Sequence, residues 1–203
     1  LFLLYMTISV QAAAEMLWFT GERPNSQARQ ALDILADAAS EGLNPESYDA
    51  RELQRAFEAA GAGPVLPAED MARLDRSLTA AMERYLTHLH FGQVDPRQVE
   101  MNFSVPRSVG FDAAAVLRAA VRDGRLREAA AEAAPDLPLY RDLRRALADF
   151  RKFADESADS PLWRTDLPPV PDRKLEPGES YSGLPQLIQR LVTANPSPGY
   201  IYR

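Results

Sequence analysis

The sequence has no cysteine, and only two of its 203 residues are histidine. Without a thiol the chain cannot form a disulfide, a thiolate zinc site, an iron–sulfur cluster or a cysteine nucleophile. Lysine is nearly absent too, with Lys152 and Lys174 the only two. Lys plus Arg number 23 against 29 Asp plus Glu, giving a net charge of −6. That balance argues against a nucleic-acid partner, since phosphate binding depends on cationic side chains.

The chain begins with a short apolar run, Leu1 to Val10, followed by the small residues Ala12, Ala13 and Ala14. This order is typical of a secretory signal peptide with its cleavage site, so we predict one over residues 1–14. The run is too short to cross a bilayer, which takes roughly 20 apolar residues. We therefore expect a periplasmic protein with no stable membrane span after cleavage. A buried N-terminal helix or an uncleaved anchor is the alternative interpretation.

Helical periodicity dominates residues 15–158. An N-cap at Pro24-Asn25-Ser26 predicts a first helix that ends at Gly42. Asp49 and Glu52 have the spacing of a capping box, which predicts a second helix over 50–60 stopping at Gly61. The strongest apolar stripe predicts a long helix closed by Gly92, and three more helices follow over 111–121, 126–134 and from Pro138 onward. No segment alternates long enough to predict a sheet, so the fold class is all-α, with six to eight helices in this domain.

Proline then becomes frequent, which predicts a stiff, extended linker over 159–180. Helical spacing returns from Tyr181 to Val192, so residues 181–203 form a partial helical module in this interpretation. The last residues, 193–203, contain turn formers and aromatics without periodicity. They suggest either a truncated gene product or an out-of-register tail.

No catalytic, cofactor-binding or metal site is predicted. His88 and His90 stand two residues apart, a spacing at which helical side chains diverge, so we expect surface or groove residues rather than metal ligands. Ser104 and Ser108 have no histidine in the same local motif. Several carboxylates occupy positions typical of helix caps or solvated faces: Glu46, Asp70, Glu83, Asp95 and Glu100.

Aromatic residues gather near the predicted helix ends. Packing of helix corners explains them, and an exposed platform for carbohydrate is the alternative. The residues concerned are Trp18, Phe19, Tyr48, Tyr85, Phe91 and Phe103.

Several sequence segments together resemble the non-catalytic N-terminal region of the large periplasmic L,D-transpeptidases. The YkuD-type catalytic domain of that family makes 3–3 cross-links in peptidoglycan. The most specific segment is the Gly-Leu-x-Pro-x-x-Tyr turn within Ala31 to Tyr48. The resemblance continues in Leu78–Leu86, Gly92–Pro96 and Pro138–Leu147, and Leu175–Leu191 is similar to the opening of the family's peptidoglycan-binding domain.

The resemblance implies a helical scaffold domain over 15–158 with peptidoglycan as a partner and the missing catalytic domain in the full-length protein. The family's catalytic His and Ser-His-Gly-Cys signature do not occur in this sequence. We therefore expect the scaffold part of an exported L,D-transpeptidase, inactive by itself and needing no cofactor. A stand-alone periplasmic murein-binding or adaptor protein is a second hypothesis, and a helical enzyme using paired carboxylates is a third.

Overall fold

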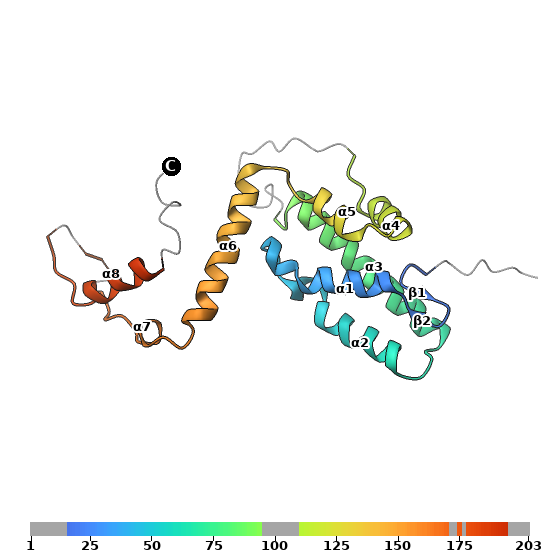
Figure 1. The fold of residues 1–203 in the computed structure, drawn as a ribbon, viewed down its shortest axis with the longest axis horizontal. Helices are drawn as coiled ribbons and strands as arrows, with labels where there is room; N and C mark the ends of the chain where they lie inside the picture. Colours follow the sequence, from blue (N-terminus) through green and yellow to red (C-terminus); the bar gives the residue numbers. More distant parts are fainter. Residues whose placement is uncertain (1–15, 95–109, 171–173, 176–177, 195–203) are drawn as a thin grey trace, which may run out of the picture. The chain divides into compact units, whose positions relative to one another are not determined.

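The computed structural model describes residues 16–94, 110–170, 174–175 and 178–194 (Figure 1). The chain divides into two compact units, Leu1–Pro135 and Asp136–Arg203. Among the described residues the first unit contains β1 (Phe19–Thr20), β2 (Arg23–Pro24), α1 (Ser26–Ala36), the 3₁₀ turns η1 (Ala38–Glu41) and η2 (Pro45–Tyr48), α2 (Ala50–Ala62), α3 (Ala68–Phe91), α4 (Ala113–Asp123) and α5 (Leu126–Ala133). The second contains α6 (Pro138–Ser157), α7 (Pro161–Arg164) and α8 (Leu184–Thr193). The all-α class is confirmed.

Helix α3 is the centre of the first unit. It contacts α1, α2, α4 and α5, and α1 in turn contacts α2 and α5. The apolar stripe of α3 explains this position because Leu78, Met82 and Leu86 are fully buried. The predicted long helix closed by Gly92 is confirmed.

A small N-terminal ribbon lies at the edge of this helical core. Antiparallel β1 and β2 pair Phe19 with Pro24 and Thr20 with Arg23 across a tight turn that includes Gly21, at φ 60°. The sequence did not predict this ribbon, because two residues a strand are too few for a period-two pattern. It places Trp18 in the core, where its side chain is 0% exposed.

Two predicted helix ends are wrong, and one predicted capping box does not form, although its helix begins at Ala50 as predicted. Helix α1 ends at Ala36, and a separate 3₁₀ turn, η1, covers the distance to Gly42. Helix α2 continues past Gly61 and ends at Ala62. Asp49 makes no capping hydrogen bond, because its backbone is left-handed, with φ 53°, and its carboxylate pairs with Arg84 at 3.3 Å instead.

Other caps follow the predicted logic. The Oδ1 atom of Asn25 accepts a hydrogen bond from the N–H of Ala28 at 2.9 Å, which confirms the N-cap of α1. Asp112 caps α4 in the same way, through the N–H of Ala115 at 3.0 Å. Gly124 ends α4 in the left-handed conformation, with φ 68°.

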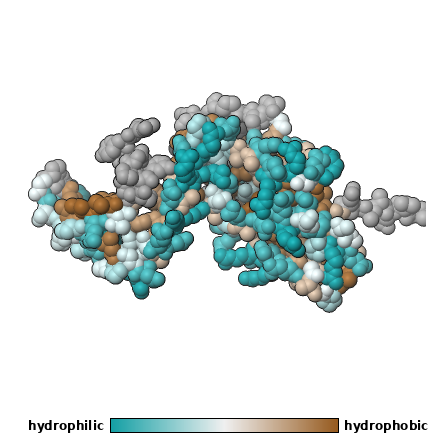
Figure 2. All heavy atoms as spheres, viewed as in Figure 1, coloured by the Kyte–Doolittle hydropathy of each residue, from teal (hydrophilic) through white to brown (hydrophobic). Residues whose placement is uncertain are grey.

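The second unit exposes much apolar surface. No residue of α6 is buried, and Leu139, Leu143 and Phe150 of the predicted apolar face are more than half exposed. In α8 the side chains of Ile188 and Leu191 are also more than half exposed. Figure 2 shows apolar atoms gathered over α8.

The proline-rich segment departs from the predicted extended linker. It contains the short helix α7, which starts at Pro161. The Leu162 carbonyl accepts a hydrogen bond from the Arg190 Nε of α8 at 2.8 Å, and the Tyr181 hydroxyl donates to the Pro168 carbonyl. These long-range contacts turn the segment back on itself, whereas proline content alone favours extension.

The compact first unit ends at Pro135, so α6 belongs to the second unit even though the sequence analysis placed it in the scaffold domain of 15–158. The domain limits stay predictions. The predicted signal peptide of 1–14 and the carboxylates Asp95 and Glu100 lie outside the described residues, as do Ser104, Ser108 and Phe103. No helix in the described part is long and apolar enough to cross a membrane.

Candidate functional site

The Gly-Leu-x-Pro-x-x-Tyr motif forms the corner between α1 and α2, here called the Gly42–Tyr48 corner. Gly42 adopts φ 78°, a left-handed conformation that suits glycine, and its N–H donates to the Ala39 carbonyl at 2.9 Å. The Oδ1 of Asn44 accepts from the N–H of Glu46 at 3.0 Å, and Pro45 begins η2. Gly42, Asn44 and Pro45 therefore each fix the backbone at a defined step of the corner.

Tyr48 anchors this corner to α3. Its side chain is 0% exposed, and its hydroxyl lies 3.0 Å from the Nδ1 of His88 and 3.4 Å from the Nε2 of Gln93. The Tyr85 ring meets the Tyr48 ring edge-on at 5.5 Å between centroids. Residues 40 positions apart are thus joined in one polar and aromatic cluster.

Burial governs the titration of this cluster. Desolvation raises the pKa of Tyr48, which the Gln93 hydrogen bond and the charge of Arg84 partly oppose. Desolvation, helped by Arg84, lowers the pKa of His88. Both neutral forms are favoured, and the Tyr48 hydroxyl accepts a hydrogen bond from Gln93 while sharing another with the His88 Nδ1. Because Tyr48 is fully buried, its hydroxyl serves to position the corner.

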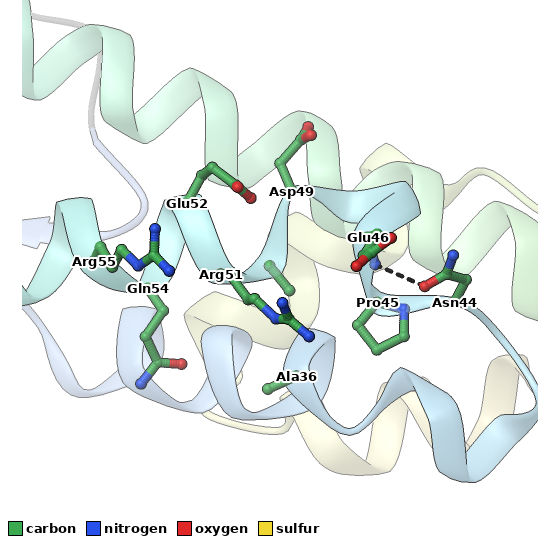
Figure 3. Close-up of a pocket in the computed structure, with 10 residues that line it drawn as sticks. Ala36, Asn44, Pro45, Glu46, Asp49, Arg51, Glu52, Gln54 and Arg55 are labelled. Atoms are coloured by element: carbon green, nitrogen blue, oxygen red, sulfur yellow. Dashed lines mark hydrogen bonds between the residues drawn. The ribbon is translucent and has the colours of Figure 1, made fainter.

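A groove opens beside this corner. Its first part has a volume of about 640 Å³ and lies between the end of α1 at Ala36, η2 and the first turns of α2. Figure 3 shows Arg51 and Arg55 on successive turns of α2, with the Gln54 side chain directed toward α1 and those of Asp49 and Glu52 directed to the opposite side. The guanidinium of Arg51 lies between Ala36 and Pro45 in this view.

A second pocket lies along the same pair of helices, and Gln54 lines both pockets. This second part of the groove, of about 530 Å³, is lined by Arg29 and Asp33 of α1 and by Phe57 and Glu58 of α2. The start of α1 therefore faces the end of α2, and the end of α1 faces the start of α2. We call the two parts together, which share Gln54, the α1–α2 groove.

The structure separates the two histidines that the sequence singled out. His88 contacts Tyr48, whereas the His90 Nδ1 lies 3.2 Å from the Ala133 carbonyl and its ring stacks on Phe111 at 4.1 Å. Both are half-buried near the end of α3. Within the described ranges no group of three His, Asp or Glu side chains could hold a metal ion.

The candidate carboxylates are dispersed. Glu46 is exposed and lines the groove, while Asp70 forms an ion pair with Arg73 at 2.7 Å one turn away on α3. Glu83 lies further along α3 and is half-buried. The sequence did not single out Arg29, Arg51 and Arg55 of the groove, and the only signal for the last two was their i, i+4 spacing on a predicted helix.

The carbohydrate-platform alternative is wrong for most of the aromatics. Trp18, Phe19, Tyr48 and Tyr85 are at most 7% exposed and belong to the core. Phe91 is 52% exposed, yet its ring also meets Phe111 edge-on at 5.9 Å. Packing at helix corners explains these residues.

The family described as Scaffold domain matches residues 11–147, more than half of the chain. The chain belongs to the scaffold-domain family. No curated protein and no solved structure matches it. The buried core of this scaffold domain, from Trp18 to Ala133, lies entirely within the matched residues. The α1–α2 groove lies within them too.

Proposed function

We propose that this chain is the non-catalytic scaffold part of an exported L,D-transpeptidase that acts in peptidoglycan 3–3 cross-linking and cell-wall biogenesis. Membership of the scaffold-domain family over residues 11–147 carries the proposal. The Gly42–Tyr48 corner supports it, because the motif that most resembles those enzymes is also the motif that joins α1 to α2.

The absent thiol gives the chemical reason for assigning no transpeptidase step to this chain. The reaction needs a nucleophile that takes the acyl group from a donor stem peptide and passes it to an acceptor. In the family that this chain resembles the nucleophile is a cysteine, and the sequence has none. The chemistry then belongs to a catalytic domain in the full-length protein, and this chain supplies a rigid support for it.

The arrangement of the core suits a support. Buried side chains run continuously from the N-terminal ribbon through α1, α2 and α3 to α5. The polar contacts at the Gly42–Tyr48 corner lie between residues distant in sequence, which fixes the helices in one register. The α1–α2 groove is open to solvent on this frame and is the candidate surface for peptidoglycan.

The first experiment measures chemistry directly. Purified chain is incubated with donor and acceptor stem peptides, or with isolated sacculi, and the products are separated by mass. We expect no 3–3 linked product from this chain, whereas a cysteine-containing L,D-transpeptidase in a parallel reaction forms it. Formation of 3–3 linkages by this chain alone would overturn the proposal.

The second experiment reads the genomic DNA on both sides of this coding sequence. A frame, or its remnant, encoding the catalytic His and Ser-His-Gly-Cys signature supports the proposal. A stop codon with no such remnant contradicts it and favours a stand-alone murein-binding adaptor. Export is tested separately by fusing residues 1–14 to a reporter enzyme that folds only in the periplasm, where we expect activity.

A further inference from the structure

The α1–α2 groove contains three cationic side chains that the fold does not use. Arg29, Arg51 and Arg55 all line it and all are exposed. Across the part of the chain that the structure describes, none of these guanidinium groups has a hydrogen-bond or ion-pair partner. Most other arginines of the first unit do have one, such as Arg84 with Asp49 and Arg127 with Asp33.

Several acidic groups of the groove are already engaged. Asp49 pairs with Arg84 at 3.3 Å, and Asp33 with Arg127 at 3.7 Å. Glu58 accepts a hydrogen bond from the Gln54 Nε2 at 2.9 Å. Among the carboxylates that line the groove, Asp33 and Asp49 are paired with arginines, whereas Glu46, Glu52 and Glu58 have no cationic partner among the described residues. Figure 3 shows Glu52 directed away from Arg51. The groove therefore offers unpaired cations to an anionic ligand.

The spacing of the cations defines the chemistry of that ligand. Arg51 and Arg55 are four residues apart on α2, so their Cα atoms are separated by roughly 6 Å along the helix. Arginine binds carboxylates through two parallel N–H···O bonds, which are shorter and stronger than neutral hydrogen bonds. Two such groups in line suit two carboxylates about two residues apart on an extended chain, which rises roughly 3.3 Å per residue.

The shape of the groove agrees with an extended ligand. Each of its two parts falls within the roughly 300–1,000 Å³ that ligand pockets occupy, and Gln54 lines both. The buried side chains of Leu32 and Phe57 provide an apolar floor in the second part. A short peptide can place carboxylates beside Arg51 and Arg55 and an apolar group beside Phe57.

We propose that the α1–α2 groove binds the carboxylates of a peptidoglycan stem peptide through Arg51 and Arg55. The identity of the peptide rests on the proposed function, whereas the preference for paired carboxylates rests on the groove. The scaffold domain then holds a strand of its polymer substrate at a place separate from the acyl-transfer chemistry.

The test titrates the full chain with a soluble stem tetrapeptide by calorimetry. We expect saturable binding that weakens as salt is added, since the contacts are charged and exposed. The double variant Arg51→Gln/Arg55→Gln should bind at least tenfold more weakly. The matched control is Arg118→Gln, which also removes an exposed helical arginine but lies on α4 outside the groove, and we expect its affinity within twofold of the unmodified chain.

A second probe is the same peptide with its carboxylates converted to amides, which should bind at least tenfold more weakly to the unmodified chain. Thermal melts of each variant check folding, and the exposed positions predict unchanged midpoints. The inference is overturned if the tetrapeptide does not bind, if the double variant matches Arg118→Gln, or if the amidated peptide binds equally well. None of these results affects the cross-linking assay or the genomic test, so a failure of this inference is distinguishable from a failure of the proposed function.

Discussion

Asp75 is the one buried charged side chain in the described core, at 9% exposed. Its Oδ1 accepts a hydrogen bond from the backbone N–H of Trp18 at 2.8 Å, and the Trp18 indole N–H donates to Thr79 at 2.8 Å. Burial raises the pKa of Asp75, while the backbone N–H groups of Trp18 and Leu17 oppose that rise. Hydrogen bonds to one turn of α3 thus hold Trp18, the residue before β1, in place.

Replacing Asp75 separates its role as an acceptor from its charge. Asp75→Asn keeps an oxygen for the Trp18 N–H, so we expect a free energy of unfolding within about 1 kcal/mol of the unmodified chain at pH 7. Asp75→Ala leaves that buried N–H without a partner and should cost about 1–3 kcal/mol. Because the folded pKa is raised, stability should fall as pH rises from about 3.9 through the raised value, and this slope should vanish in Asp75→Asn. Urea titrations measure both effects, and equal losses in the two variants would contradict the assignment.

The lowered pKa of His88 predicts that stability depends on pH with the opposite sign. Because the folded pKa is the lower one, the unfolded chain binds the proton more readily. The stabilising contribution of neutral His88 is present above the unfolded value of about 6.5 and is lost as pH falls toward the lowered folded value. We expect urea midpoints to decrease from pH 7.5 to pH 5.5 and to decrease less in His88→Gln. An unchanged slope in that variant shows that His88 is not the titrating group.

At the scale of elements, the connections between helices require particular backbone conformations. The Gly42–Tyr48 corner needs a left-handed residue at Gly42, with φ 78°. Gly61 resembles it in sequence, as a glycine near a predicted helix end, yet it lies inside α2 with open space around the position of a Cβ atom. The two glycines therefore have opposite energetic roles.

This pair gives a matched prediction. Gly42→Ala should lower the free energy of unfolding by about 1–2 kcal/mol, the cost of a left-handed conformation for a residue with a Cβ atom. Gly61→Ala should raise it by about 0.5–1 kcal/mol, because alanine is the better helix former. Chemical denaturation followed by circular dichroism measures both. A destabilising Gly61→Ala would show that α2 does not continue through this position.

The side chain of Arg23, in β2, caps the C-terminus of α2. Its Nη1 donates to the carbonyls of Ala60, Gly61 and Gly63, at 2.9, 3.1 and 2.8 Å. The first two carbonyls lie in the last turn of α2 and the third belongs to the residue that follows it, so they have few intrahelical partners. We expect Arg23→Ala to cost about 1–2 kcal/mol and to speed amide hydrogen exchange in the last turn of α2. Arg23→Lys keeps the charge and should recover part of the loss, and an exchange rate unchanged by Arg23→Ala would refute the capping role.

At the scale of the whole molecule, the two units differ in how they are stabilised. Every buried hydrophobic side chain of the described residues belongs to the first unit. The second unit is held by contacts such as Phe153 against Trp163 at 5.6 Å and Arg190 over the Trp163 ring at 5.5 Å. A unit that buries so little apolar area gains little free energy on folding.

The two tryptophans report the units separately, since Trp18 lies in the first and Trp163 in the second. We expect the second unit to unfold at a lower urea concentration than the first. In Trp163→Phe the remaining fluorescence change should follow the later, cooperative transition of the first unit, and in Trp18→Phe it should follow the earlier one. Coincident transitions in the two variants would show that the units unfold together.

Much of the helical order could be predicted because apolar spacing, Asn25 and Gly124 each act within one or two turns. The failures share a cause. Asp49 has the sequence of a cap, but the corner before it forces a left-handed backbone and Arg84 takes its carboxylate. Gly61 has the sequence of a stop, but Arg23 satisfies the carbonyls of a longer helix. Residues far along the chain decided both positions.

The candidate site likewise combines features set by local sequence with features set by contacts between distant residues. The Gly-Leu-x-Pro-x-x-Tyr motif was visible in the sequence, because a corner with a left-handed glycine and a proline start is local chemistry. The pairing of Arg51 and Arg55 with Gln54 and Phe57 in one groove required the packing of α1 against α2.

The sequence by itself determined the all-α class, the absence of thiol chemistry and the corner motif, since composition and short-range periodicity act without tertiary contacts. Only the tertiary structure decided that the aromatics are core rather than platform, that Tyr48 binds His88, and that three arginines are left without partners along one groove. Burial and pairing depend on which helices meet, and that depends on the whole core.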